Sequence, residues 1–173
     1  MMVFSARYIS QPYSGEYIEK IYDIKSRWNS GDWSWVLFED EKSVWCGEFR
    51  GSFRGVALSE KLQIIVVLTS DYMYVLDIET SEVMDYRSQP PYVDITTTPS
   101  GDILVTDGYG VDVLKGKKLS DIDCITVVSV HPDNLRFQEY VENRLRIICY
   151  ELGVWDKEIE LYLDCNTLEW IDG

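Results

Sequence analysis

The chain has 173 residues, 46% of them hydrophobic, and its 30 acidic against 16 basic side chains give a net charge of −14. This composition is typical of a globular protein and argues against a disordered one, and the length suits one domain, 1–173. No apolar run approaches the roughly 20 residues of a membrane-spanning helix. The N-terminal stretch MMVFSARYIS lacks the pattern of a signal peptide. We therefore expect a cytoplasmic protein.

Strands are expected along most of the chain, beginning with an edge strand within residues 1–12. Residues 14–28 place Tyr17, Ile21 and Ile24 at helical spacing behind Ser14, a suitable N-cap, which predicts one short helix near residues 15–27. The same stretch also fits the alternation of a strand. Two aromatic strands follow at 33–38 and 43–49, joined by an acidic turn.

The middle and end of the chain continue as β-branched and aromatic runs separated by turn residues. The segment 135–142 fits either a strand or a turn of helix, and 131–134 fits a turn. The further strands expected are 56–58, 62–69, 72–78, 83–86, 92–98, 103–106, 111–114, 125–130, 144–152, 158–163 and 168–171.

A repeated unit underlies this pattern. Residues 76–82 and 163–169 share the motif L-D-x-x-T-x-E. The turns after Phe38, Leu76 and Leu114 lie 38 residues apart, and the turn after Leu163 follows 49 residues later. This spacing is close to that of propeller blades, about 40 residues.

The strand, small-residue turn and LDxxT.E pattern of 56–119 resembles a blade of quinoprotein-like or WD-type β-propellers. The resemblance implies an all-β antiparallel meander of about four hairpin repeats with a propeller-like arrangement. A two-sheet β-sandwich is the alternative, because turn chemistry alone makes meandering hairpins look alike.

The sequence contains no catalytic, phosphate-binding or metal-binding motif, so we expect neither an enzyme nor a cofactor or metal site. His131 suits a surface turn better than a catalytic base, since no nucleophile is placed beside it. Cys46 has glycine and arginines nearby, but burial against Trp45 is the better interpretation. The four cysteines, with no CxxC pair, are expected to be reduced and structural; Cys124, Cys149 and Cys165 lie in apolar strand contexts.

The negative charge disfavours binding to nucleic acid or to a membrane surface and favours a basic protein partner. An acidic surface that only keeps the protein soluble is the plainer alternative. The residues proposed to contact the partner are Trp33, Trp35, Glu39, Asp40 and Glu41. We predict a non-enzymatic interaction module, in concrete form an immunity-type inhibitor of a basic bacterial toxin. The alternative is a domain that binds a small ligand or a carbohydrate on a Trp33 and Trp35 platform.

Overall fold

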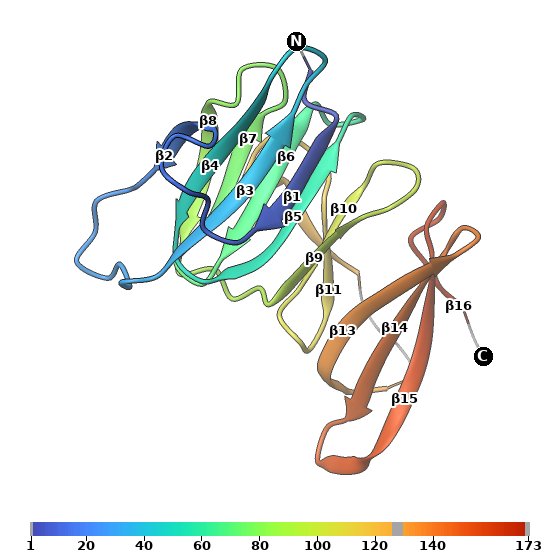
Figure 1. Cartoon of the computed structure of the whole chain (residues 1–173). Coiled ribbons are helices and arrows are strands. Elements are labelled where there is room, and N and C mark those ends of the chain that lie inside the picture. Colours follow the sequence, from blue (N-terminus) through green and yellow to red (C-terminus); the bar gives the residue numbers. More distant parts are fainter. Residues whose placement is uncertain (1, 126–129, 172–173) are drawn as a thin grey trace.

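The runs of β-branched and aromatic residues form strands that group into four sheets of four strands each (Figure 1). The computed structural model describes residues 2–125 and 130–171. The strands are β1 (Ser5–Ile9), β2 (Ile18–Tyr22), β3 (Trp33–Glu39), β4 (Val44–Arg50), β5 (Phe53–Ser59), β6 (Ile64–Thr69), β7 (Tyr72–Asp77), β8 (Val83–Ser88), β9 (Asp94–Thr97), β10 (Ile103–Thr106), β11 (Val111–Leu114), β12 (Ile122–Ile125), β13 (Pro132–Val141), β14 (Arg144–Glu151), β15 (Val154–Asp164) and β16 (Trp170–Ile171). The predicted all-β, propeller-like fold is confirmed.

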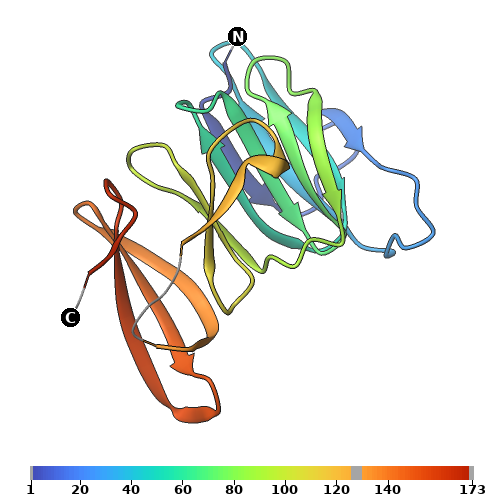
Figure 2. The same ribbon diagram turned by 180° about the vertical axis from the view of Figure 1, so that it is seen from behind.

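Three of the sheets are simple meanders in which each strand pairs with the next one in sequence. We name the sheets in chain order: sheet B holds β5 to β8, sheet C holds β9 to β12, and sheet D holds β13 to β16. Sheet A has the order β1-β3-β4-β2. Its edge strand β2 precedes β3 in the sequence and pairs with β4 in parallel. The four sheets follow one another in a row, with A and D at its ends (Figures 1 and 2).

The core lies between neighbouring sheets. One apolar cluster joins sheet A to sheet B, a second joins B to C, and a third joins C to D. β6 is buried on both faces: Ile65 and Val67 face sheet A, whereas Ile64 and Val66 face sheet C. This two-sided burial explains why its sequence is an uninterrupted apolar run instead of an alternating one.

The predicted helix near residues 15–27 is wrong. Part of that segment forms β2, whose residues pair with β4 from Ile18 opposite Trp45 to Tyr22 opposite Phe49. Tyr22 is buried, while Ile21, which the helical pattern would place in the core, is exposed. Sheet pairing and the burial of Tyr22 therefore override a weak helical periodicity. The one helix in residues 2–125 and 130–171 is a single 3₁₀ turn, Leu119–Asp121.

One further departure from the predicted elements lies at the start of sheet D. The turn expected at 131–134 is wrong, since β13 begins at Pro132; a shift in pairing between Asp133 and Arg136 absorbs the turn-forming residues. The ambiguous segment 135–142 is part of that strand. Of the strand predicted at 125–130, Ile125 ends β12, and 126–129 lie outside the described residues.

The repeated motif is a repeated turn. The Asp77 carboxylate accepts the backbone N–H groups of Glu79 and Thr80, both at 3.0 Å. The Asp164 carboxylate accepts those of Asn166 and Thr167 at 2.8 and 3.1 Å. Each of these two turns, like the turn after Leu114, leads into the last strand of its sheet, which lies at the sheet edge. The turn after Phe38 instead joins β3 to β4, the two inner strands of sheet A. The first interval of 38 residues therefore connects turns that are not equivalent.

No helix within residues 2–125 and 130–171 has both the length and the apolar character that crossing a membrane requires.

Candidate protein-binding surface

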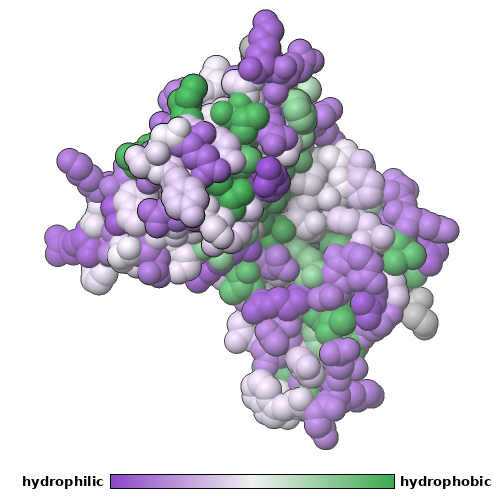
Figure 3. Space-filling view, in the orientation of Figure 1, coloured by the Kyte–Doolittle hydropathy of each residue, from purple (hydrophilic) through white to green (hydrophobic). Residues whose placement is uncertain are grey.

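Negative charge is concentrated at one end of the row of sheets. Residues 131–173, which include sheet D, contain ten acidic and four basic side chains. Residues 1–51, which include sheet A, contain eight acidic and six basic ones. Long-range attraction of a basic protein therefore acts most strongly at sheet D. In the space-filling view, sheet D forms the projection at the bottom of the molecule, where hydrophilic residues (purple) lie among paler and hydrophobic ones (Figure 3).

The outward face of sheet D carries a cross-strand charge network. Leu145 and Ile147 of β14 are buried against sheet C, so Arg146 between them points outward. Its guanidinium donates to Glu160 at 3.0 Å and to Glu139 at 3.4 Å. The Tyr162 hydroxyl also donates to Glu160. Hydrogen bonds from Arg146 and Tyr162 lower the pKa of Glu160, which keeps this carboxylate ionised.

The hairpin between β14 and β15 projects an apolar tip from this acidic sheet. Gly153 takes the positive φ of 84° that the tight turn requires. Beside it, Leu152 and Val154 are exposed, and the Trp155 side chain is 75% exposed. Asp156, Lys157 and Glu158, also exposed, follow in β15. An exposed tryptophan bordered by polar side chains is typical of the anchor residues of protein interfaces.

The residues that the sequence suggested as one contact surface lie at two ends of the same strand. Trp33 begins β3 and Glu39 ends it, so about 20 Å separates them at the rise of a strand. Trp33 and Trp35 share the face of sheet A that points away from sheet B, and both are half-buried. The Arg50 guanidinium lies 3.8 Å from the centre of the Trp33 ring, so one face of this ring is already covered. The prediction of a small-ligand platform there stays a prediction.

The acidic turn after β3 combines a structural carboxylate with solvent-exposed charge. The Asp40 carboxylate accepts the N–H groups of Lys42 and Ser43, each at 2.7 Å, and these bonds lower its pKa. Glu39 lies 3.6 Å from Arg7 as an ion pair. Glu41 is exposed. Asp40 therefore stabilises its own turn, and Glu41 presents the most open carboxylate of the predicted set.

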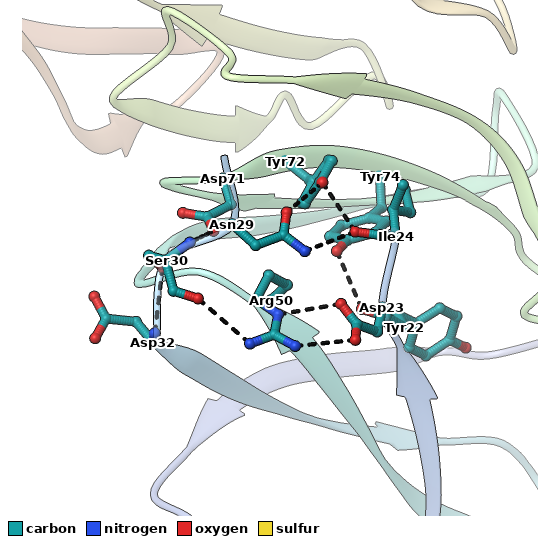
Figure 4. A network of polar contacts seen from close by, with 10 residues as sticks. All are labelled: Tyr22, Asp23, Ile24, Asn29, Ser30, Asp32, Arg50, Asp71, Tyr72 and Tyr74. Atoms are coloured by element: carbon teal, nitrogen blue, oxygen red, sulfur yellow. Dashed lines mark hydrogen bonds and ion pairs between the residues drawn. The ribbon is translucent and has the colours of Figure 1, made fainter. Parts of the chain in front are cut away.

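A polar network fixes the loop between β2 and β3 against sheet B (Figure 4). Arg50 donates to both carboxylate oxygens of Asp23, at 3.1 and 2.9 Å. Asp71 accepts the Ser30 N–H at 2.6 Å, and the Tyr72 hydroxyl donates to Asn29 at 2.5 Å. A hollow of about 520 Å³ lies beside this network. Since Asp23 neutralises Arg50, we interpret the network as structural.

The groups considered for catalysis are not arranged for it. Cys46 is fully buried, and its burial, with Glu48 and Glu19 nearby, raises its pKa to about 11, so the thiolate is scarce near neutral pH. His131 is exposed, and its backbone N–H donates to Glu151 at 3.3 Å. In the described part of the chain, no group of three or more His, Cys, Asp or Glu side chains could hold a metal ion.

The four cysteines, all in described segments, form no disulfide with one another. Cys46, Cys149 and Cys165 are buried, as a structural role requires. Cys124, which was expected to be structural in an apolar strand context, is instead exposed on β12, an edge strand of sheet C.

Sequence reasoning missed sheet D as a surface. Residues 158–163 alternate charged and apolar side chains, and the same pattern is typical of any strand with one solvated face. A count of charges by segment would have singled out residues 131–173.

No family model matches the chain, and no curated protein matches it. Among solved structures, a chain of the S. cerevisiae complex of Dbp5 L327V with Nup159, Gle1 H337R, IP6 and ADP matches with a TM-score of 0.47 and 14% identity. The N-terminal domain of Nup159 matches with a TM-score of 0.46 and 16% identity. Each match covers 70% of this chain and 33% of the other, so this chain spans about a third of the length of the structures that it matches.

Proposed function

We propose that the chain is a non-enzymatic interaction module that binds a basic protein, and that sheet D makes the contact. The observation that carries this proposal is the joint location of the largest acidic excess and of an exposed apolar tip at Trp155. The charge speeds the encounter with a basic surface, and the desolvated aromatic side chain supplies affinity once contact is made. The predicted site on β3 offers these two features only at separate ends of one strand.

An inhibitor that covers the basic active site of another protein is the concrete form of this proposal. Bacterial immunity proteins, which neutralise toxins, work in this way. Support comes from the projecting hairpin of sheet D, which stands clear of the other sheets in both views (Figures 1 and 2). A projecting acidic hairpin can enter a concave basic site that a flat surface could not reach.

The proposal is tested by affinity capture from the source organism at low and moderate salt with three forms of the chain. The first is wild type. The second carries Asp156→Asn with Glu158→Gln, and the third, a matched control, carries Glu41→Gln with Glu79→Gln. All four replaced side chains are exposed, and both variants lose the same charge.

We expect wild type and the control to retain the same basic protein and the sheet D variant to retain at most about a tenth as much, a loss of roughly 1.4 kcal/mol in binding. Recovery of no basic protein by wild type, or equal recovery by all three forms, would contradict the proposal.

A further inference from the structure

Within the described residues, the strands of sheet D leave part of one of its edges uncovered. β15 spans 11 residues. Its outer neighbour β16, as described, pairs only with Tyr162 and Leu163. On that side, the stretch 154–160 of β15 has no partner strand among the described residues, and both ribbon views show the end of β15 near the hairpin tip without a neighbour (Figures 1 and 2). We call this stretch the open edge.

The open edge presents backbone groups that can pair with another strand. The Asp164 N–H donates to the Glu169 carbonyl at 2.9 Å, toward the side of β16. Backbone direction alternates along an antiparallel strand, so Tyr162, Glu160 and Glu158 point their N–H and C=O groups to the same side. The backbone N–H and C=O groups of Glu158 and Glu160 therefore point away from β14 at the open edge, in the plane of the sheet, and offer two donors and two acceptors.

The two faces of the open edge differ in chemistry. Glu158 and Glu160 project from the outward face of sheet D, as their pairing opposite Tyr150 and Ile148 requires. Ile159 and Leu161 project to the other face, where both are half-buried against the apolar cluster between sheets C and D. A strand added beside residues 158–161 would place every second side chain beside the carboxylates of Glu158 and Glu160 and the intervening ones beside Ile159 and Leu161. Lys157 lies on the face of Ile159, next to the hairpin tip.

The charge of the edge selects the occupant. Acidic side chains on an edge strand repel the same edge of another copy, which is how proteins avoid pairing with themselves. The repulsion becomes attraction for a strand whose side chains on that face are basic. A heterologous basic strand therefore fits the open edge better than a second copy of this chain.

We propose that the open edge of β15 binds an extended segment of the partner by strand addition, and that basic and apolar residues alternate in that segment. This inference rests on the proposed function and names the part of the partner that is recognised. Main-chain hydrogen bonds to Glu158 and Glu160 give the segment its register. Arg146 already pairs with the Glu160 carboxylate, so the exposed Glu158 carboxylate is the one that pairs with a basic side chain of the segment.

The first test uses defined peptides and the unmodified chain. The probe is a labelled peptide of alternating lysine and valine, and binding is followed by fluorescence anisotropy. Two further peptides carry N-methyl groups on all lysines or on all valines, and a fourth has the same composition in two blocks. In an added strand, the N–H groups of all lysines point to one side and those of all valines to the other, and only one side faces β15. We therefore expect one methylated peptide to bind as tightly as the parent peptide. The other methylated peptide and the block peptide should bind at least about tenfold more weakly.

The second test changes the protein. Proline is tolerated on an edge strand where its missing N–H would face solvent, so Glu158→Pro is expected to keep the fold and to weaken the alternating peptide at least about tenfold. Glu158→Gln is the control for charge, and we expect it to weaken the peptide less than the proline does. Circular dichroism and thermal melting check that both variants are folded. The methylated peptides decide the question if Glu158→Pro does not fold.

Several outcomes would overturn strand addition. They are equal binding of both methylated peptides, equal binding of the block peptide, and unchanged binding by a folded Glu158→Pro variant. If the alternating peptide does not bind while the chain still captures a basic protein through sheet D, strand addition is wrong and the proposed function stands. If neither binds, the proposed function fails as well.

Discussion

Phe49 is the residue through which the packing of sheet A on sheet B is best tested. Its side chain is fully buried in the cluster between these sheets. Its ring stacks on Tyr22 of β2 at 4.4 Å between centroids and meets the edge of Tyr74 of β7 at 5.2 Å. The Phe49 ring thus joins β2, which the sequence left ambiguous between helix and strand, to β7, an inner strand of sheet B.

We expect Phe49→Ala to reduce the free energy of unfolding by about 3–5 kcal/mol, the usual cost of removing a fully buried phenylalanine. At roughly 2–4 °C per kcal/mol for a chain of this size, the melting temperature should fall on the order of 10 °C. Urea unfolding followed by circular dichroism gives the free energy, and a thermal scan gives the temperature. Phe4→Ala is the matched control, because Phe4 is 53% exposed and its loss should cost about 0.5 kcal/mol or less.

A loss below about 1 kcal/mol for Phe49→Ala, or equal losses for both variants, would refute this packing. Either result would mean that β2 and its Tyr22 are not held against β4 and β7 in solution. The correction from helix to strand at residues 18–22 would then fall too.

Three further outcomes follow from individual sites. Gly51 has a φ of 103°, and a Cβ at this position would lie 2.7 Å from the Thr69 hydroxyl oxygen. Gly51→Ala should therefore lower the free energy of unfolding by about 1–3 kcal/mol, whereas the control Gly31→Ala, whose Cβ would meet nothing within 4 Å, should not. Equal urea midpoints for the two variants would contradict this prediction. The N–H groups of Thr80 and Glu79 lower the pKa of Asp77, so its ionised form stabilises the fold above the ordinary aspartate pKa of about 4 and this contribution is lost as pH falls through the folded value. Asp77→Asn should therefore be less stable than wild type near neutral pH, with a gap that closes in acid, as urea midpoints at several pH values would show; a gap independent of pH would count against the turn. Cys124 is exposed, whereas burial raises the pKa of Cys46. A thiol reagent near pH 8 should therefore modify Cys124 at least about tenfold faster than Cys46 in the native chain, and the two cysteines at similar rates in denaturant. Similar rates in the native chain would contradict the burial of Cys46.

Sequence reasoning succeeded where the signal was local. The strands Ile103–Thr106 and Val111–Leu114 have the predicted bounds because turn residues delimit them on both sides. The aspartates at 77 and 164 were interpreted as turn chemistry, and each accepts backbone N–H groups in the same way. Such features depend on neighbours in the chain, which the sequence contains.

It failed where the deciding partner was distant. β2 is a strand because β4, more than twenty residues later, accepts it as a parallel neighbour, and no local pattern encodes that. The order β1-β3-β4-β2 depends on the same distant pairing, and for this reason the turn after Phe38 is not equivalent to the turns after Leu76 and Leu114 with which the spacing aligned it. At the candidate surface, the sequence shows the acidic residues at 158 and 160. It does not show that no described strand lies beside them, because that depends on how far the described β16 extends along β15.

The most direct test of the binding account locates the contact by hydrogen–deuterium exchange. The chain is measured alone and saturated with the basic protein that it captures, and exchange is read from peptides that cover the described residues. We expect new protection in the peptides that contain Val154–Asp164, centred on Glu158 and Glu160, and little change in those that contain Trp33–Glu39. Protection at Trp33–Glu39 and its acidic turn, with β15 unchanged, would contradict the assignment of binding to sheet D.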